Sequence, residues 1–219
     1  WQIAETMIVH QGIDKPSAWK NAIALMTETG IQDAAIKARQ YPFEFSGGML
    51  QRVAIAMAIA SKPKLLIADE PTTALDVTLQ QQMLDILQNL QRHHNLSIIL
   101  ITHDLGVVAR IADSVGVMYA GQIIEYGSRE QILKEAAHPY TISLKQALPS
   151  RDKKHRLKNI PGTPPELINP PQACGFASRC EQCMNICHQC MPPLHADGLH
   201  YSRCWLHDPR AIKRAEAEQ

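Results

Sequence analysis

The chain has 219 residues, 45% of them hydrophobic, and a formal net charge of +1 at pH 7. This length allows one or two domains with a sizeable core. The near-zero charge indicates no general attraction to nucleic acid or anionic lipid, so we expect no nucleic-acid partner. The longest apolar runs, such as residues 53–60, reach about half of the ~18–20 residues that a membrane-spanning helix needs. No secretory signal pattern is present, so the sequence indicates a soluble, cytosolic polypeptide.

The first 40 residues predict a helical region. Ile3 and Met7 recur at helical spacing before Gly12, and a second apolar pattern begins after Pro16 and ends near Gly30. Packing into a core is sufficient to explain these apolar residues.

A helix start suited to phosphate follows at residues 45–52, which read Phe-Ser-Gly-Gly-Met-Leu-Gln-Arg. Ser46 is a suitable N-cap, and Gly47 and Gly48 remove side chains where a ligand could approach the backbone. The free N–H groups at such a helix start favour phosphate binding. On its own, the Ser-Gly-Gly triplet is a weak signal.

Two short apolar runs predict buried parallel strands with polar ends. Residues 65–70 read Leu-Leu-Ile-Ala-Asp-Glu, and residues 97–102 are followed by His103. In open α/β sheets ligands bind beyond the carboxyl ends of the strands, which is where Asp69 and Glu70 fall. Because Mg²⁺ prefers carboxylate oxygen, this pair predicts a metal position beside a phosphate.

The remaining core is predicted to alternate helices and strands. Asp76 is expected to cap an amphipathic helix over residues 77–93. Further elements are expected at residues 105–112 (a helix), 114–119 and 122–127 (strands) and 129–148 (a helical pair).

All six cysteines lie beyond residue 170, after a basic polar linker at residues 150–159 and proline-rich stretches. Disulfides are rare in cytosolic proteins, so metal or cluster ligation explains the cysteines better. The pairs Cys180-x-x-Cys183 and Cys187-x-x-Cys190 have zinc-site spacing. Only three residues separate the two pairs, which is tight for one zinc site.

In this order and spacing, the segments resemble the ATP-binding subunits of ABC transporters. Residues 46–48 resemble the ABC signature motif, and residues 65–70 resemble the Walker B motif with its catalytic glutamate. Residues 74–76 resemble the D-loop, and His103 resembles the switch histidine. The resemblance implies an α/β fold, namely part of a P-loop NTPase (ABC-type) nucleotide-binding domain with a helical subdomain and a Cys-rich C-terminal extension.

The resemblance also implies ATP and Mg²⁺ as ligands and a role for each residue. Glu70 would be the general base for the attacking water, Asp69 would hold Mg²⁺ through water, and His103 would contact the γ-phosphate. The residues expected to close over ATP held by an opposite subunit, or to couple the two sites, are Ser46, Gly47, Gly48, Gln51 and Asp76.

Two features resemble the oligopeptide and dipeptide importers in particular. Met49 stands where most ABC proteins have Gln, and Gln51 and Arg52 fit the peptide-importer variant. The tail resembles that family's C-terminal extension, whose cysteine spacing implies a [4Fe–4S] cluster, with Zn²⁺ as the alternative and Cys183 and Cys190 as free thiols. The cysteines that match this spacing are Cys174, Cys180, Cys187 and Cys204.

The predicted function is therefore ATP hydrolysis that powers import of peptides or similar small solutes, at the cytoplasmic face of the inner membrane. A second ATP-binding subunit, permease subunits and a substrate-binding protein are the implied partners. The expected divisions are residues 1–62 (helical subdomain with the signature motif), 63–148 (later part of the nucleotide-binding core) and 149–219 (linker and Cys-rich extension).

The sequence contains no P-loop motif, Gly-x-x-x-x-Gly-Lys-Ser/Thr, and begins at Trp1. These features predict a fragment that follows the P-loop and the Q-loop and is inactive alone. Two alternatives remain: an ABC ATPase with no role in transport, and a metal-binding fragment without enzyme activity.

Overall fold

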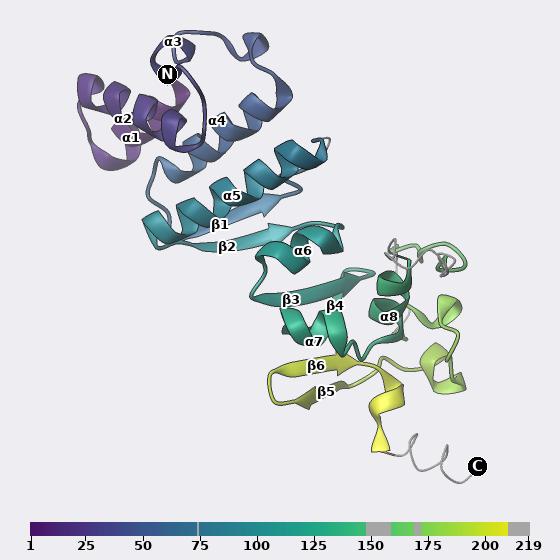
Figure 1. Ribbon diagram of the computed structural model, residues 1–219. Helices are drawn as coiled ribbons and strands as arrows, with labels where there is room; N and C mark the ends of the chain where they lie inside the picture. Colours follow the sequence, from purple (N-terminus) through teal and green to yellow (C-terminus); the bar gives the residue numbers. More distant parts are fainter. Residues whose placement is uncertain (74, 148–158, 169–171, 210–219) are drawn as a thin grey trace. The chain divides into compact units, whose positions relative to one another are not determined.

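The computed structural model describes residues 1–73, 75–147, 159–168 and 172–209. The chain forms two compact units, Trp1–Val107 and Val108–Gln219 (Figure 1). The basic linker predicted from the sequence falls mainly on residues 148–158, outside the described residues. The three-part functional division stays a prediction.

The first unit begins with four helices: α1 (Gln2–Gln11), α2 (Lys15–Glu28), α3 (Ala34–Lys37) and α4 (Gly47–Ile59). A short 3₁₀ turn, η1 (Pro42–Glu44), precedes α4. Gly12 ends α1 in the left-handed conformation, and the Asp14 carboxylate caps α2 by accepting from the Ser17 N–H at 3.1 Å. The predicted helical region is confirmed. Its core consists of Ile3, Ala4, Met7, Ala18, Ala22, Met26, Ile31, Ala34, Ala56 and Ala60.

The second part of this unit is a parallel pair of strands with a helix between them in the chain (Figure 1). Strand β1 (Leu65–Asp69) pairs with β2 (Ser97–Ile101), and Asp69 lies opposite Ile101. Helix α5 (Val77–His94) buries the apolar stripe that its sequence predicts. The strands and the helix therefore occur where the sequence places them.

One face of the β1–β2 sheet is exposed, so the prediction of fully buried strands is wrong. Successive strand residues point to opposite faces. Leu66 and Ala68 are buried, whereas their neighbours in β1 are not. No segment within the described part of the chain covers the second face. The exposed apolar side chains are Leu65, Ile67, Ile99 and Ile101.

The second unit contains a four-stranded antiparallel sheet in the order β3–β4–β6–β5. The predicted hairpin of β3 (Ser114–Tyr119) and β4 (Gln122–Ser128) is confirmed. The sequence does not predict β5 (Leu194–Asp197) or β6 (His200–Arg203), which extend this sheet from the tail. The short helices are α6 (Leu105–Ile111), α7 (Arg129–Lys134), α8 (Pro139–Gln146), η2 (Ala177–Arg179), η3 (Asn185–His188) and η4 (Trp205–His207).

A buried carboxylate joins three segments of the second unit. Glu125 of β4 has no exposed surface and accepts from the backbone N–H groups of Ala137 (2.6 Å) and His138 (3.0 Å). His200 Nε2 of β6 lies 2.9 Å from the same carboxylate. His138 is also buried, which lowers its pKa to about 4, so its neutral ring caps α8 by accepting from the Tyr140 N–H. The network fixes β6 and the start of α8 to β4.

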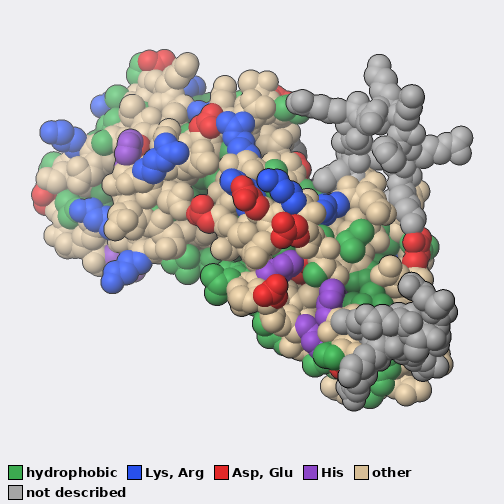
Figure 2. All heavy atoms as spheres, turned by 60° about the horizontal axis from the view of Figure 1, so that its bottom comes forward, with side chains coloured by type: hydrophobic (Ala, Val, Ile, Leu, Met, Phe, Trp, Pro, Cys, Tyr) green, Lys and Arg blue, Asp and Glu red, His purple; other side chains and the backbone are tan. Residues whose placement is uncertain are grey.

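The surface carries charges of both signs. On the face drawn in Figure 2, Lys and Arg side chains are interspersed with Asp and Glu.

Tyr41 and Phe43 are exposed and stack at 5.6 Å between ring centroids, just before α4. Among the described residues, no helix combines the length and apolar character needed to cross a membrane.

Replacing His200 with alanine should destabilise the second unit by about 1–3 kcal/mol, because a buried oxygen of Glu125 loses its side-chain partner and keeps only its backbone N–H donors. His200→Gln, whose side-chain amide can still donate to Glu125, should lose less stability than His200→Ala. Urea unfolding of the chain measures both effects, with His93→Ala at an exposed position as the control. A His200→Ala variant that is no less stable than His200→Gln would contradict a stabilising hydrogen bond between residue 200 and Glu125.

Candidate functional site

The carboxyl ends of β1 and β2 bring three of the predicted site residues together, namely Asp69, Glu70 and His103. The Glu70 N–H donates to the Ile101 carbonyl at 2.9 Å, so the strand ladder continues one residue beyond Asp69. Glu70 then takes a left-handed φ of 48°, which is uncommon for a residue other than glycine. The chain turns sharply there, with Asp69 exposed and Glu70 half-buried at the sheet edge.

Glu70 is held by hydrogen bonds to both carboxylate oxygens. His103 Nδ1 lies 2.8 Å from Oε1, and the Thr73 hydroxyl donates to Oε2 at 2.7 Å. The bond with His103 contributes most to lowering the pKa of Glu70, and the bond with Thr73 adds to it. The contact with Glu70 raises the pKa of His103 in turn. At neutral pH Glu70 is thus an ionised carboxylate, able to accept a proton.

Asp69 suits an Mg²⁺ ion that keeps most of its water. Its carboxylate ends β1, is exposed, and lies next to the Glu70 carboxylate in sequence. Mg²⁺ is usually bound by one or two carboxylates together with water and substrate phosphate. No group of three or more His, Cys, Asp or Glu side chains in the described residues could hold a metal ion by itself.

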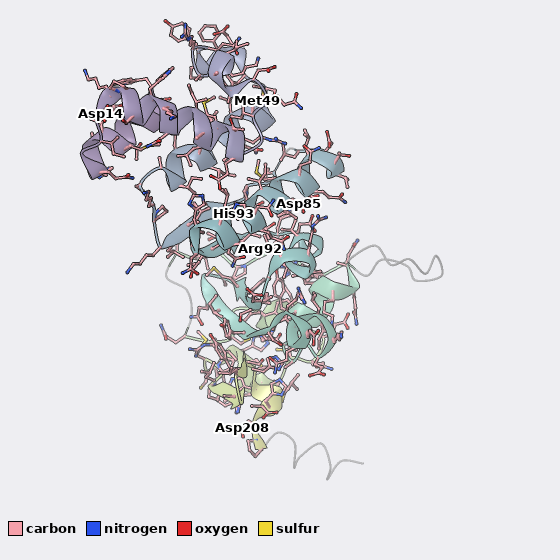
Figure 3. All side chains as sticks on the ribbon, turned by 60° about the vertical axis from the view of Figure 1, so that its left-hand side comes forward. Asp14, Met49, Asp85, Arg92, His93 and Asp208 are labelled. Atoms are coloured by element: carbon pink, nitrogen blue, oxygen red, sulfur yellow. The ribbon has the colours of Figure 1, made fainter. Side chains whose placement is uncertain are left out.

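The predicted phosphate-binding helix start is open. The Ser46 hydroxyl caps α4 by accepting from the Met49 N–H at 3.4 Å, and Met49 lies in the first turn (Figure 3). A Cβ added at Gly47 would meet nothing within 4 Å, and one at Gly48 would make only ordinary contacts with leucine side chains. The first N–H groups of this 13-residue helix are accessible to an anion.

The loop after β1 is connected to two helices. Asp76 caps α5, its carboxylate accepting from the Leu79 N–H at 2.8 Å, as the sequence predicts. The Gln51 amide of α4 donates to the Thr73 carbonyl at 3.4 Å. Thr73 is a site residue that the sequence patterns do not single out, although a hydroxyl three residues after Glu70 in a turn is a usable signal.

Two family models match the chain. The model described as "ABC transporter" matches residues 2–73, which include the open start of α4 and the end of β1. The model described as "Oligopeptide/dipeptide transporter, C-terminal region" matches residues 124–187.

Curated relatives cover nearly the whole chain. The dipeptide transport ATP-binding protein DppD of Lactococcus lactis is 48% identical over 97% of this chain and 62% of its own length. The oligopeptide transport ATP-binding protein OppD of Bacillus subtilis is 49% identical over 97% of this chain and 60% of its own length. The chain belongs to the oligopeptide/dipeptide family of ABC transporters. It spans about 60% of the length of these two relatives.

A solved structure has the same fold in part. The CbiO1 protein of Clostridium perfringens, described as part of an ABC transporter complex, superposes with a TM-score of 0.52 and 28% identity. The match covers 61% of this chain and 52% of CbiO1. The P-loop NTPase-type α/β core expected for this family is therefore shown, whereas a Cys-rich extension receives no support from these comparisons.

The cysteines of the second unit form a loose group. Burial raises the pKa of Cys204 to about 12, and the thiols of Cys174, Cys180 and Cys187 add to this shift. Cys183 belongs to the same group, because it hydrogen-bonds Cys187 and lies 3.3 Å from His188 Nε2. The backbone brings two of the four cysteines predicted from family spacing together, because the Cys174 N–H donates to the Cys187 carbonyl at 3.0 Å. As described, however, neither an iron–sulfur nor a zinc site is formed by them.

Glu70→Gln should lower the pKa of His103 toward its ordinary value of about 6.5, because a neutral amide cannot stabilise the imidazolium by charge. NMR titration of the histidine rings measures this shift. His94, which pairs with Glu28 at 2.9 Å, is the internal control and should not change. An unaltered pKa for His103 would show that the pair with Glu70 does not form in solution.

Proposed function

We propose that this chain supplies the signature helix and the catalytic strand ends of an ATP-hydrolysing subunit that powers peptide import. The observation that carries the proposal is the cluster at the ends of β1 and β2, where His103 and Thr73 hold the Glu70 carboxylate. The names of the relatives, dipeptide and oligopeptide transport ATP-binding proteins, support peptides as the transported solute.

Glu70 acts as the general base. Its two oxygens offer about four acceptor positions, and the donors from His103 and Thr73 occupy only two of them. The others remain for the water that attacks the γ-phosphate and passes its proton to Glu70. Mg²⁺, when bound, neutralises charge on the phosphates, and Asp69 is the residue that would hold it through water. His103, 82% exposed, is free to turn toward the γ-phosphate.

The start of α4 closes over ATP bound by a second ATP-binding subunit. The exposed Gly47 and the half-buried Gly48 carry no side chain that would keep phosphate from the helix N–H groups, and Ser46 adds a hydroxyl. Asp76 at the start of α5 couples the two nucleotide sites of this dimer. Gln51 already donates to Thr73, so we assign its role to the loop after β1 and not to direct contact with nucleotide.

The remaining partners follow from the same family membership. Permease subunits carry the solute, and a substrate-binding protein delivers it. The subunit works at the cytoplasmic face of the membrane, bound to the permease. Within it, residues 1–62 form the helical subdomain, 63–148 the later part of the nucleotide-binding core, and 149–219 the linker and C-terminal extension.

In a subunit of the relatives' full length that contains this chain, Glu70→Gln should lower the turnover of ATP by about 10²–10⁴-fold. The amide has nearly the same shape but cannot accept the water's proton, so nucleotide binding should persist. Phosphate release and ATP binding are the two measurements, with Glu28→Gln as a control away from the site. Turnover close to that of the wild type would remove Glu70 from the role of base.

We also propose that the second unit binds a [4Fe–4S] cluster, with Zn²⁺ as the alternative. The support is the family-like spacing of the four cysteines and the backbone hydrogen bond that brings Cys174 to Cys187. Cation binding would displace the thiol protons that burial favours. The cluster would fasten a proline-rich tail, which has few apolar residues of its own. The proposed ligands are Cys174, Cys180, Cys187 and Cys204.

Protein prepared without oxygen should be brown and contain about four irons per chain. Cys174→Ser should remove the colour, because a serine hydroxyl is a poor substitute for a thiolate. Cys190→Ser, at an exposed cysteine outside the proposed set, is the matched control and should keep it. Metal analysis decides between the alternatives: one zinc and no iron would favour the paired-cysteine site.

A further inference from the structure

Thr73 contacts the proposed general base in two ways. Its N–H donates to the Glu70 carbonyl at 3.1 Å, which closes the turn after β1. Its hydroxyl donates to Glu70 Oε2 at 2.7 Å. A third contact leads away from the site, because the Thr73 carbonyl accepts from the Gln51 amide at 3.4 Å. One threonine thus joins α4 to both the backbone and the side chain of Glu70.

Thr73 is better suited than His103 to fix the carboxylate. The His103 ring is 82% exposed and reaches Glu70 from the segment that follows β2. Thr73 has a short, β-branched side chain with restricted χ1 rotation, and its backbone belongs to the same turn as Glu70. Its hydroxyl can therefore hold Oε2 in one place while His103 exchanges its partner for a ligand.

We propose that Thr73 is a positioning residue, which orients the Glu70 carboxylate and links it through Gln51 to helix α4. The positioning follows from the geometry of the turn alone. Its consequence for ATP hydrolysis rests on the proposed function. Through this link, a ligand at the start of α4 could alter the orientation of Glu70 within the same chain.

The histidine tautomer of His103 tests the positioning without any nucleotide. A neutral imidazole whose Nδ1 faces a carboxylate is held as the Nδ1–H tautomer, whereas a free ring favours Nε2–H. Two-bond ¹H–¹⁵N correlation spectra of this 219-residue chain, recorded above the His103 pKa, report the tautomer. His103→Ala assigns the signals, and Glu70→Ala gives the reference for a lost partner.

We expect the Nδ1–H tautomer in the wild type and in Thr73→Ser, which keeps the hydroxyl. Thr73→Val, with the same shape but no hydroxyl, should shift His103 toward the Glu70→Ala spectrum. Gln51→Ala should give an intermediate spectrum. A Thr73→Val spectrum identical to that of the wild type would overturn the positioning role, and an unchanged Gln51→Ala spectrum would overturn the link to α4.

Hydrolysis by the full-length subunit tests the consequence. Thr73→Val should lower kcat about tenfold with little change in KM for ATP, as expected for a lost hydrogen bond that orients the base, and Thr73→Ser should restore it. A rise in KM of about tenfold, or an unchanged kcat, would overturn a role in catalysis. If the wild type does not hydrolyse ATP while the tautomer results hold, the proposed function fails and the positioning of Glu70 stands.

Discussion

The candidate site depends on the register between β1 and β2. Asp69 lies opposite Ile101, and the next residue, Glu70, still bonds to the Ile101 carbonyl. His103 follows Ile101 by two residues, which lets its ring reach the Glu70 carboxylate. In a sheet, a slip of one residue turns every side chain of a strand to the other face. The observed register thus places Glu70 and His103 beside each other, so the site depends on strand pairing.

The loop between β1 and α5 is fixed at both ends, which is why it can position a reactive group. Glu70 begins it with a left-handed turn, and Asp76 ends it as the N-cap of α5. Helix α5 is in turn anchored by its buried stripe, which includes Leu87 and Leu90. Thr73 lies midway, where a hydroxyl meets the carboxylate without any rearrangement of the backbone.

Local signals explain which parts of this structure the sequence could predict. A cap residue and an apolar stripe are sufficient to place α5, and an unbroken apolar run is sufficient to place β1. Strands β5 and β6 are four residues each and pair with each other as a hairpin. Their place in the sheet depends on the pairing of β6 with β4 and on the contact of His200 with Glu125, which are distant in sequence. The apolar runs do not predict the exposed sheet face, because parallel sheets usually have both faces covered by other elements.

Side-chain contacts across the turn were the hardest to foresee. The distance between Thr73 and Glu70 depends on the positive φ of Glu70, and nothing in the residue type predicts that conformation for a glutamate. The spacing of the cysteines predicts a metal or cluster site, and it does not predict the hydrogen bond between Cys183 and Cys187. In both cases the backbone path, and not the residue pattern, decides which side chains meet.

The chain uses the same chemical pair in two different ways, and burial accounts for the difference. Glu70 and His103 meet at 2.8 Å with the histidine 82% exposed, so water can replace either partner and the pair contributes little to stability. Glu125 and His200 meet at 2.9 Å with exposures of 0% and 14%, where losing one partner leaves the other polar group away from water without that hydrogen bond. The exposed pair can therefore exchange a partner for a ligand at small cost, as a reactive site requires. The buried pair cannot, and it serves to hold the tail to the second sheet.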